Sequence, residues 1–226
     1  MPQYSFEFDF SGFNVKGDKY NDNCNTVILH GAGKSSRARF KKLRHALNKK
    51  GLSSMSFDFV GHGESEGELK NSSLEKRFEQ AKVTIKQQSP DFSTLIASSM
   101  SAYTAIKLTE IFPIKNLILM VPAVYTSKAY TLTFGPSFSK TIREKNSWLN
   151  SDAFSILKEF KGNLLIIAAQ NDEVIPPLLL ERIYSSASSA KSKKLHIIPN
   201  AEHRNLFPKI GDFDLSLDLI HTMSKT

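Results

Sequence analysis

The feature that most constrains the fold is the alternation, from residue 26 onward, of short apolar runs with longer segments of helical periodicity. We expect strands at 26–30, 53–59, 94–98, 116–121, 163–169 and 194–198, and helices at 34–50, 72–88, 100–111, 152–160, 177–188 and 212–223. Strands separated by helices favour a mainly parallel sheet with helices on both faces, which is the α/β class.

Two more strands are expected ahead of this alternation, at residues 4–10 and 13–20, with Ser11-Gly12 as the turn between them. They bring the sheet to about eight strands and give it an antiparallel beginning. The length of 226 residues suits one domain. No internal repeat and no linker divides the chain, so we expect a single domain over residues 1–226.

Composition excludes several classes of protein. With 40% hydrophobic residues the chain is not disordered. No apolar run approaches the roughly 18 residues of a membrane helix, and the start MPQYSFEFDF has no signal-peptide pattern. The single cysteine, Cys24, excludes an internal disulfide and a cysteine metal cluster. We therefore expect a soluble, cytoplasmic protein with no metal site.

The formal net charge of +8 is confined to one segment, residues 34–50, which holds no acid. Its basic residues are Lys34, Arg37, Arg39, Lys41, Lys42, Arg44, Lys49 and Lys50. A solvated basic helix face is the favoured interpretation, and attraction of an anionic substrate, an anionic membrane surface or an acidic partner stays open. Nucleic acid is not an expected partner, because no nucleic-acid-binding motif accompanies the charge.

Residues 122–151 interrupt the alternation of strands and helices and are dense in aromatic side chains. These are Tyr125, Tyr130, Phe134, Phe138 and Trp148. They follow the strand that ends near Val121, and open α/β sheets bind ligands at the carboxyl ends of their strands. We expect a small cap here. Its aromatics either line a substrate pocket or form the core of the cap itself, and both can hold together.

A candidate nucleophile lies at the junction of the strand at 94–98 with the helix that follows it. A serine presented on a sharp strand-to-helix turn, the nucleophile elbow, needs small residues two positions before and after it. Ser99 meets this requirement with Ala97 and Ser101, whereas neighbouring serines would place isoleucine or tyrosine at one of those positions. The usual motif has glycine at both positions, and this departure puts the efficiency of turnover in question.

Serine needs a neighbouring base, and the base needs an orienting acid. An acidic pair, Asp172-Glu173, follows the strand at 163–169, and His203 follows the strand at 194–198. Both segments are loops at the carboxyl end of the expected sheet. The turn His30-Gly31-Ala32-Gly33 ends an earlier strand, where free backbone N–H groups are expected. The amides of Ala32 and Met100 are the candidate oxyanion hole. The turn lacks the glycine spacing of a phosphate-binding loop.

Five blocks occur in the order HGAGKSS, FDFVGHGESEG, LIASSMSA, AAQNDEVIP and PNAEHR. The chain thereby resembles an α/β-hydrolase of the branch that contains monoacylglycerol lipases, cinnamoyl esterases and serine aminopeptidase-like hydrolases. The likeness spans roughly residues 27–203. It implies that Ser99 is the nucleophile, Asp172 rather than Glu173 the acid, and His203 the base. It also implies backbone oxyanion donors at Ala32 and Met100.

The resemblance implies a serine hydrolase that cleaves a carboxylic ester or thioester through an acyl-enzyme, with no metal or organic cofactor. The cap is far shorter than the lid of monoacylglycerol lipases, so small or medium acyl substrates are expected. The block Asp-x-x-Gly-His-Gly-x-Ser, which begins at Asp58, is expected to organise a turn near the site rather than to act in catalysis. The alternative is a binding or regulatory protein that keeps the fold without catalysis.

Overall fold

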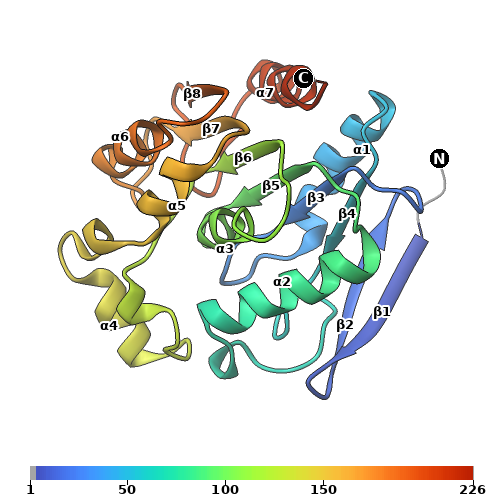
Figure 1. Ribbon diagram of the computed structural model, residues 1–226, viewed down its shortest axis with the longest axis horizontal. Helices are drawn as coiled ribbons and strands as arrows, with labels where there is room; N and C mark the ends of the chain where they lie inside the picture. Colours follow the sequence, from blue (N-terminus) through green and yellow to red (C-terminus); the bar gives the residue numbers. More distant parts are fainter. Residues whose placement is uncertain (1–3, 226) are drawn as a thin grey trace.

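The computed structural model describes residues 4–225 and contains an eight-stranded sheet in the order β1-β2-β4-β3-β5-β6-β7-β8 (Figure 1). The strands are β1 (Tyr4–Phe10), β2 (Phe13–Lys19), β3 (Thr26–Leu29), β4 (Ser54–Phe57), β5 (Thr94–Ser98), β6 (Asn116–Met120), β7 (Asn163–Ala169) and β8 (Ser192–Ile198). β1 and β2 pair antiparallel, as do β2 and β4, and every other pair is parallel. The predicted mainly parallel α/β sheet is confirmed.

The central strands are apolar throughout because helices cover both of their faces. Every residue of β6 and β7 is buried. Side chains alternate between the two faces, so Leu117 and Leu119 join one apolar cluster while Ile118 and Met120 join the other. The two clusters form separate cores above and below the sheet.

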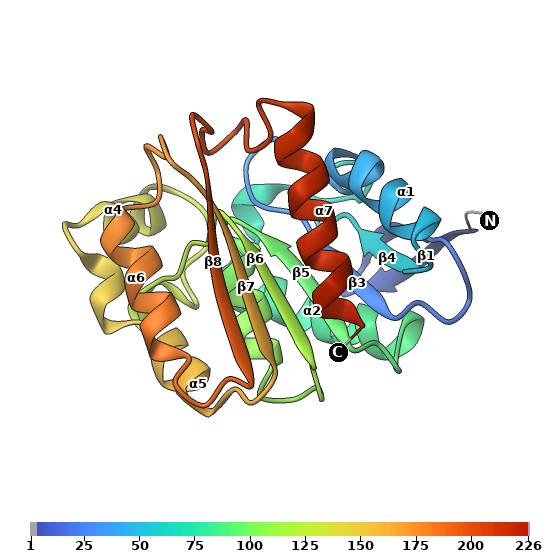
Figure 2. The same cartoon turned by 90° about the horizontal axis from the view of Figure 1, so that it is seen from above.

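Two helices, α1 (Lys41–Lys49) and α7 (Ile210–Ser224), pack on one face of the sheet. The other face is covered by α2 (Leu74–Gln88), α3 (Ser101–Leu108), α5 (Ala153–Glu159) and α6 (Pro177–Ser186). Figure 2 shows the sheet between these two layers. Apart from the segment 34–50, the helices begin and end within a few residues of the expected positions. One difference is the cap of α2, where Ser73 rather than Ser72 accepts the Lys76 amide at 3.1 Å.

The N-terminal hairpin lies at one edge of the sheet, with Tyr4 paired to Lys19 and Phe10 to Phe13. Gly17 in β2 leaves room for the side chain of Phe6, its partner in β1. A Cβ atom at this position would lie 2.2 Å from Cζ of Phe6, because the phenyl ring of Phe6 crosses the strand there. The other edge of the sheet is β8.

The cap segment (residues 122–151) contains the short helices η3 (Ser127–Ala129), α4 (Pro136–Arg143) and η4 (Ser147–Asn150). Backbone hydrogen bonds attach it to the beginning of α2. The Glu75 amide donates to the Tyr130 carbonyl at 3.0 Å, and the Phe134 amide donates to the Ser72 carbonyl at 2.9 Å. Figure 1 shows α4 at one end of the molecule, away from the strands.

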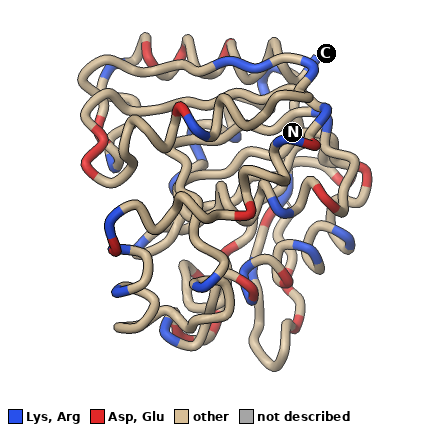
Figure 3. Tube along the Cα trace, turned by 60° about the vertical axis from the view of Figure 1, so that its left-hand side comes forward, with Lys and Arg blue, Asp and Glu red and all other residues tan. Residues whose placement is uncertain are grey.

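The basic segment does not form one continuous helix. It contains a short 3-10 helix, η1 (Arg37–Phe40), that leads into α1. Arg44 is buried, and its guanidinium binds Asp18, as does that of Arg37. The interpretation of this segment as a solvated face is therefore wrong for these two arginines. Elsewhere basic and acidic positions are interspersed along the chain (Figure 3). None of the helices within residues 4–225 has the length and apolarity to cross a membrane.

Candidate active site

Ser99 lies at the sharp turn between β5 and α3, with a left-handed φ of 51° that a non-glycine residue rarely adopts. Hydrogen bonds of both its amide and its carbonyl stabilise this strained backbone conformation. The Ser99 amide donates to the Met120 carbonyl at 2.9 Å, and its carbonyl accepts from the amides of Ala102 at 2.9 Å and Ala123 at 3.1 Å. These bonds to neighbouring strand and helix fix the direction in which the side chain projects.

The structure brings together the three side chains that the sequence places in different loops. Oγ of Ser99 lies 3.0 Å from Nε2 of His203. Nδ1 of His203 lies 3.0 Å and 2.9 Å from the two carboxylate oxygens of Asp172. A carboxylate only accepts, so Nδ1 carries the ring proton and Nε2 is left to accept the serine hydroxyl.

The loop after β7 fixes the carboxylate of Asp172. Its Oδ1 accepts the amides of Val174 at 2.8 Å and Ile175 at 2.9 Å, and its side chain is only 3% exposed. Two backbone donors and the imidazole together satisfy this buried charge. The side chain of His203 is 15% exposed, so its ring lies at the boundary between the protein and the cleft.

The turn after β3 passes very close to Ser99. A Cβ atom on Gly31 would lie 3.2 Å from Cβ of Ser99 and 3.4 Å from the Ser98 carbonyl oxygen, so this position favours glycine. Gly31, Ala32 and Ser99 line the same cavity. Within residues 4–225 no hydrogen bond is donated by the amides of Ala32 and Met100, the two candidate oxyanion donors.

A buried arginine that the sequence analysis did not identify connects α2 to this turn. The side chain of Arg77 has no exposed surface, and its guanidinium lies 3.7 Å from the centroid of the Phe59 ring. Its Nη2 donates to the carbonyl of His30 at 2.8 Å, to that of Gly31 at 3.3 Å, and to Oγ of Ser101 at 2.8 Å. Among the residues described, no carboxylate pairs with it. Burial lowers the pKa of Arg77 to about 9, which leaves it charged at neutral pH.

Ser101 occupies the position where the usual elbow has glycine, and its hydroxyl makes two hydrogen bonds. It accepts from Arg77 and donates to the His30 carbonyl. The extra side chain thus joins the elbow to the turn after β3. In the sequence, Arg77 is only an arginine on an amphipathic helix. No local pattern indicates that it binds Ser101 and the His30 carbonyl.

His30 is a second buried group that acts on the same turn. Its Nε2 accepts the Phe59 amide at 3.1 Å, so the proton is on Nδ1, which donates to the Gly31 carbonyl at 2.7 Å. Burial, and then the charge of Arg77, hold the pKa of His30 well below its usual value. The same two causes lower the pKa of His62 to about 4. Both rings are therefore neutral at physiological pH.

The Asp58 block organises a turn, as expected. The Asp58 carboxylate is 1% exposed and accepts the amides of Arg37 at 2.7 Å and Glu64 at 3.0 Å. Gly63 has a φ of 54°, and a Cβ there would lie 2.2 Å from Oδ2 of Asp58. None of these groups lines the cavity that holds Ser99. Within residues 4–225 no three His, Cys, Asp or Glu side chains are placed to hold a metal ion.

The cap aromatics pack on one another and on residues of α3 and α5, and they do not line the cavity at Ser99. Ring centroids of Phe134 and Phe138 are 4.8 Å apart, and those of Tyr125 and Phe138 are 5.9 Å apart. Tyr130 packs on Tyr103, and Trp148 packs on Phe154. None of the five predicted pocket residues lines the cavity of about 640 Å³ that contains Ser99 and His203. These contacts favour the alternative in which the aromatics form the core of the cap.

A family model described as serine aminopeptidase, S33, matches residues 23–155, which is more than half of the chain. Among curated proteins, none matches this sequence. A predicted CIB-like hydrolase from Thermoplasma acidophilum is 18% identical, with a TM-score of 0.72 over 98% of this chain and 99% of that one. A monoacylglycerol lipase from Paleococcus ferrophilus is 17% identical, with a TM-score of 0.71 over 100% and 99%. Est1E from Butyrivibrio proteoclasticus, solved with ferulic acid, is 18% identical, with a TM-score of 0.71 over 96% of each chain.

At such identities the likeness to solved structures shows the fold alone, and that fold is the α/β-hydrolase fold expected from the sequence. The family match includes the turn at Gly31, the Asp58 block and the elbow at Ser99, and it ends before Asp172 and His203. The expected family is thereby confirmed. The chain belongs to the S33 serine aminopeptidase family of α/β hydrolases.

Proposed function

We propose that this protein is a serine hydrolase that cleaves a carboxylic ester or thioester through a covalent acyl-enzyme. The observation that carries the proposal is the continuous series of hydrogen bonds from Ser99 Oγ through His203 to Asp172, at the wall of an open cavity. Nucleophile, base and orienting acid within hydrogen-bond distance are the geometric requirement for activating a serine.

In the first half of the reaction, Oγ of Ser99 attacks the acyl carbonyl carbon while Nε2 of His203 takes the hydroxyl proton. The carboxylate of Asp172 keeps the imidazole in the tautomer with Nδ1 protonated and stabilises the imidazolium that forms. His203 then donates the proton to the leaving oxygen or sulfur, and the acyl-enzyme remains. In the second half, His203 takes a proton from water, which attacks the acyl-enzyme and releases the acid.

The negative oxygen of each tetrahedral intermediate is assigned to the amides of Ala32 and Met100. One such donor is typically worth about 3–4 kcal/mol of transition-state stabilisation. The carbonyl of the Gly31–Ala32 peptide accepts from both His30 Nδ1 and Arg77 Nη2. These bonds orient the peptide whose N–H is the proposed donor, and they polarise it in the direction that strengthens that donor.

Substrates of small or medium size fit the proposal best, because the aromatics of the cap segment pack on one another. Esters and thioesters use the same residues. Neighbours in fold include the lipase and esterase above and a thioesterase domain from the curacin biosynthetic pathway. A binding protein without catalysis is the second candidate, and the absence of both elbow glycines is the observation that favours it.

The deciding experiment is intact-mass analysis and peptide mapping after exposure to an alkyl fluorophosphonate, with Ser99→Ala alongside. This reagent forms a stable adduct with an activated serine. We expect a single adduct on Ser99 that is absent from the variant. If folded wild-type protein gives no adduct, the hydrolase proposal fails and the binding protein becomes the better explanation.

A further inference from the structure

The cleft beside Ser99 is cationic. The cavity of about 640 Å³ that holds Ser99 and His203 is also lined by Lys34, Arg39 and Arg204. A second cavity of about 270 Å³ shares Arg39, Ser98, His203 and Arg204 with it, so the two cavities are adjacent, and together they are called the groove here. Neither cavity has an aspartate or glutamate among its lining residues within the described chain.

Most of the other cations of the basic segment are paired with an acid or packed on an aromatic ring, including Lys42, which lines the second cavity. Arg37 and Arg44 pair with buried carboxylates, and Lys50 pairs with Asp218 at 2.9 Å. Lys42 lies 4.2 Å from the centroid of the Phe213 ring. The basic segment thus contains cations that bind other groups of the protein and cations that remain available to a ligand.

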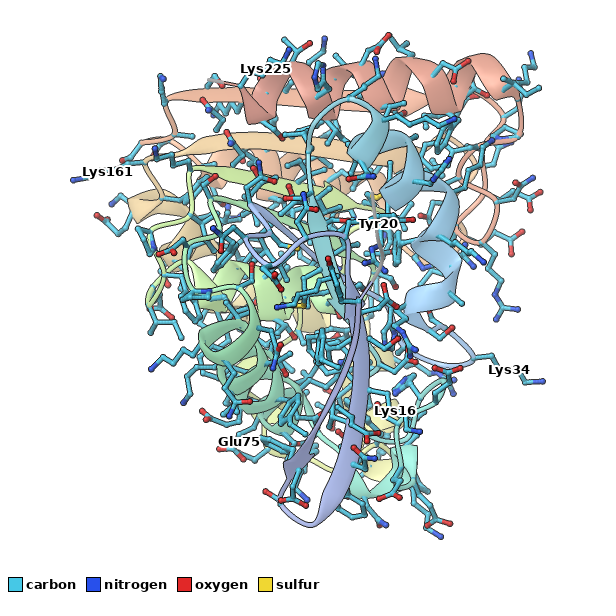
Figure 4. All side chains as sticks on the ribbon, turned by 90° about the vertical axis from the view of Figure 1, so that its right-hand side faces the viewer. Lys16, Tyr20, Lys34, Glu75, Lys161 and Lys225 are labelled. Atoms are coloured by element: carbon cyan, nitrogen blue, oxygen red, sulfur yellow. The ribbon has the colours of Figure 1, made fainter. Side chains whose placement is uncertain are left out.

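Arg39 and Arg204 belong to the available group. Both side chains are exposed, and neither pairs with an acid among residues 4–225. Nη2 of Arg39 donates to the backbone carbonyl of Arg204 at 2.6 Å, and both residues line the same two cavities. Two guanidinium groups without a counter-ion favour an anion, and each offers a planar fork that matches a carboxylate or phosphate. Lys34, which also lines the larger cavity, extends away from the ribbon (Figure 4).

The position of these arginines relative to His203 indicates which half of the ester they contact. The leaving oxygen takes its proton from His203, so the alcohol half must lie on the side of that ring. Arg204 directly follows His203, and Arg39 is bonded to Arg204. We propose that the substrate is an ester whose alcohol half carries an anionic group, a carboxylate or phosphate, bound by Arg39 and Arg204. This inference rests on the proposed ester hydrolysis at Ser99.

The test compares two esters that differ only in charge, 4-acetoxybenzoate and 4-acetoxybenzamide. The carboxamide withdraws electrons more strongly and makes the better leaving group, so intrinsic reactivity opposes the expected preference. We expect kcat/KM for the carboxylate to exceed that for the carboxamide by roughly tenfold at low salt, and the ratio to decrease as ionic strength rises.

The double variant Arg39→Gln/Arg204→Gln should bring this ratio to one or below, because only the intrinsic reactivity of the two esters then remains. Both side chains are exposed, and glutamine keeps a donor for the Arg204 carbonyl, so the fold is not at risk. The matched control is Lys49→Gln, which removes an exposed cation from the same basic segment outside the groove and should leave the ratio unchanged. A ratio of one or less in the wild type, or a preference that survives the double variant, overturns the inference.

Labelling by a neutral alkyl fluorophosphonate distinguishes a failure of the proposed hydrolysis at Ser99 from a failure of the proposed anionic substrate. If Ser99 is labelled and the carboxylate is not preferred, hydrolysis stands and the anionic substrate is refuted. If Ser99 is not labelled and neither ester is cleaved, the proposed function fails and the anionic substrate fails with it.

Discussion

Removing the hydroxyl of Ser101 should destabilise the protein although alanine is a good helix residue. Oγ of Ser101 is fully buried, accepts from the guanidinium of Arg77 at 2.8 Å and donates to the His30 carbonyl. A hydrogen bond to a charged group is worth about 1.5–3 kcal/mol. Nη2 of Arg77 keeps its bond to the His30 carbonyl, so that carbonyl is not left unpaired. We expect Ser101→Ala to lower the free energy of unfolding by about 2–3 kcal/mol.

Urea unfolding at constant m-value measures this difference. The matched control is Ser98→Ala, three residues earlier, whose hydroxyl makes no hydrogen bond within residues 4–225 and should change stability by less than about 0.5 kcal/mol. Ser101→Gly restores the usual elbow residue and should cost about 1 kcal/mol more than Ser101→Ala, because glycine loses more chain entropy at the start of α3. Equal stability of Ser98→Ala and Ser101→Ala, or a glycine variant more stable than the wild type, refutes the reasoning.

The other predictions concern strain, close approach, protonation and buried charge. Ser99→Ala should reduce kcat by at least about 10⁴-fold, and Ser99→Gly should be about 1 kcal/mol more stable than Ser99→Ala in urea because φ is 51°. Gly31→Ala should lower kcat/KM by about 10–100-fold, since its Cβ would lie 3.2 Å from Cβ of Ser99, whereas Gly211→Ala, where nothing lies within 4 Å, should leave it unchanged. His62 has a pKa of about 4 when folded and about 6.5 when unfolded. Only the unfolded chain binds this proton between those values, so stability should decrease by up to about 3 kcal/mol as pH falls from 6.5 to 4, and less so in His62→Gln. Asp18→Asn should destabilise by about 3–5 kcal/mol, measured by urea, since Arg37 and Arg44 both bind its carboxylate.

The strands, Ser99 and the loops that carry the other two triad groups were accessible from local sequence pattern, and the choice of Asp172 over Glu173 came from the family resemblance. The bounds expected for 163–169 and 94–98 agree with β7 and β5 residue for residue. Asp172 and His203 follow their strands directly, and parallel strands bring their carboxyl ends to one edge of the sheet. Chain order and strand ends were therefore enough to predict which loops meet.

Long-range partners were not accessible in this way. The eight bases of residues 34–50 look alike in sequence, yet Arg44 is 3% exposed and bound to Asp18, twenty-six residues away, while Arg39 remains exposed at the cleft. Arg77 finds the carbonyl of His30 at a separation of 47 residues. Arg44 and Arg77 lie on helices, α1 and α2, and their partners lie in or after strands of the sheet. Which group each one meets therefore depends on how the helix packs on the sheet and not on local sequence.

The absence of elbow glycines has a different meaning once these partners are known. Glycine at the elbow provides room, and Ser101 fills that room with a hydroxyl bound to Arg77 and to the His30 carbonyl. The same guanidinium reaches the Gly31 carbonyl, the other end of the peptide that offers the Ala32 amide. Burying the guanidinium of Arg77 without a carboxylate partner costs free energy, so another effect must offset that cost. That effect is the fixed turn beside Ser99. Ser101 in place of the elbow glycine is therefore evidence for the proposed catalysis and not for its loss.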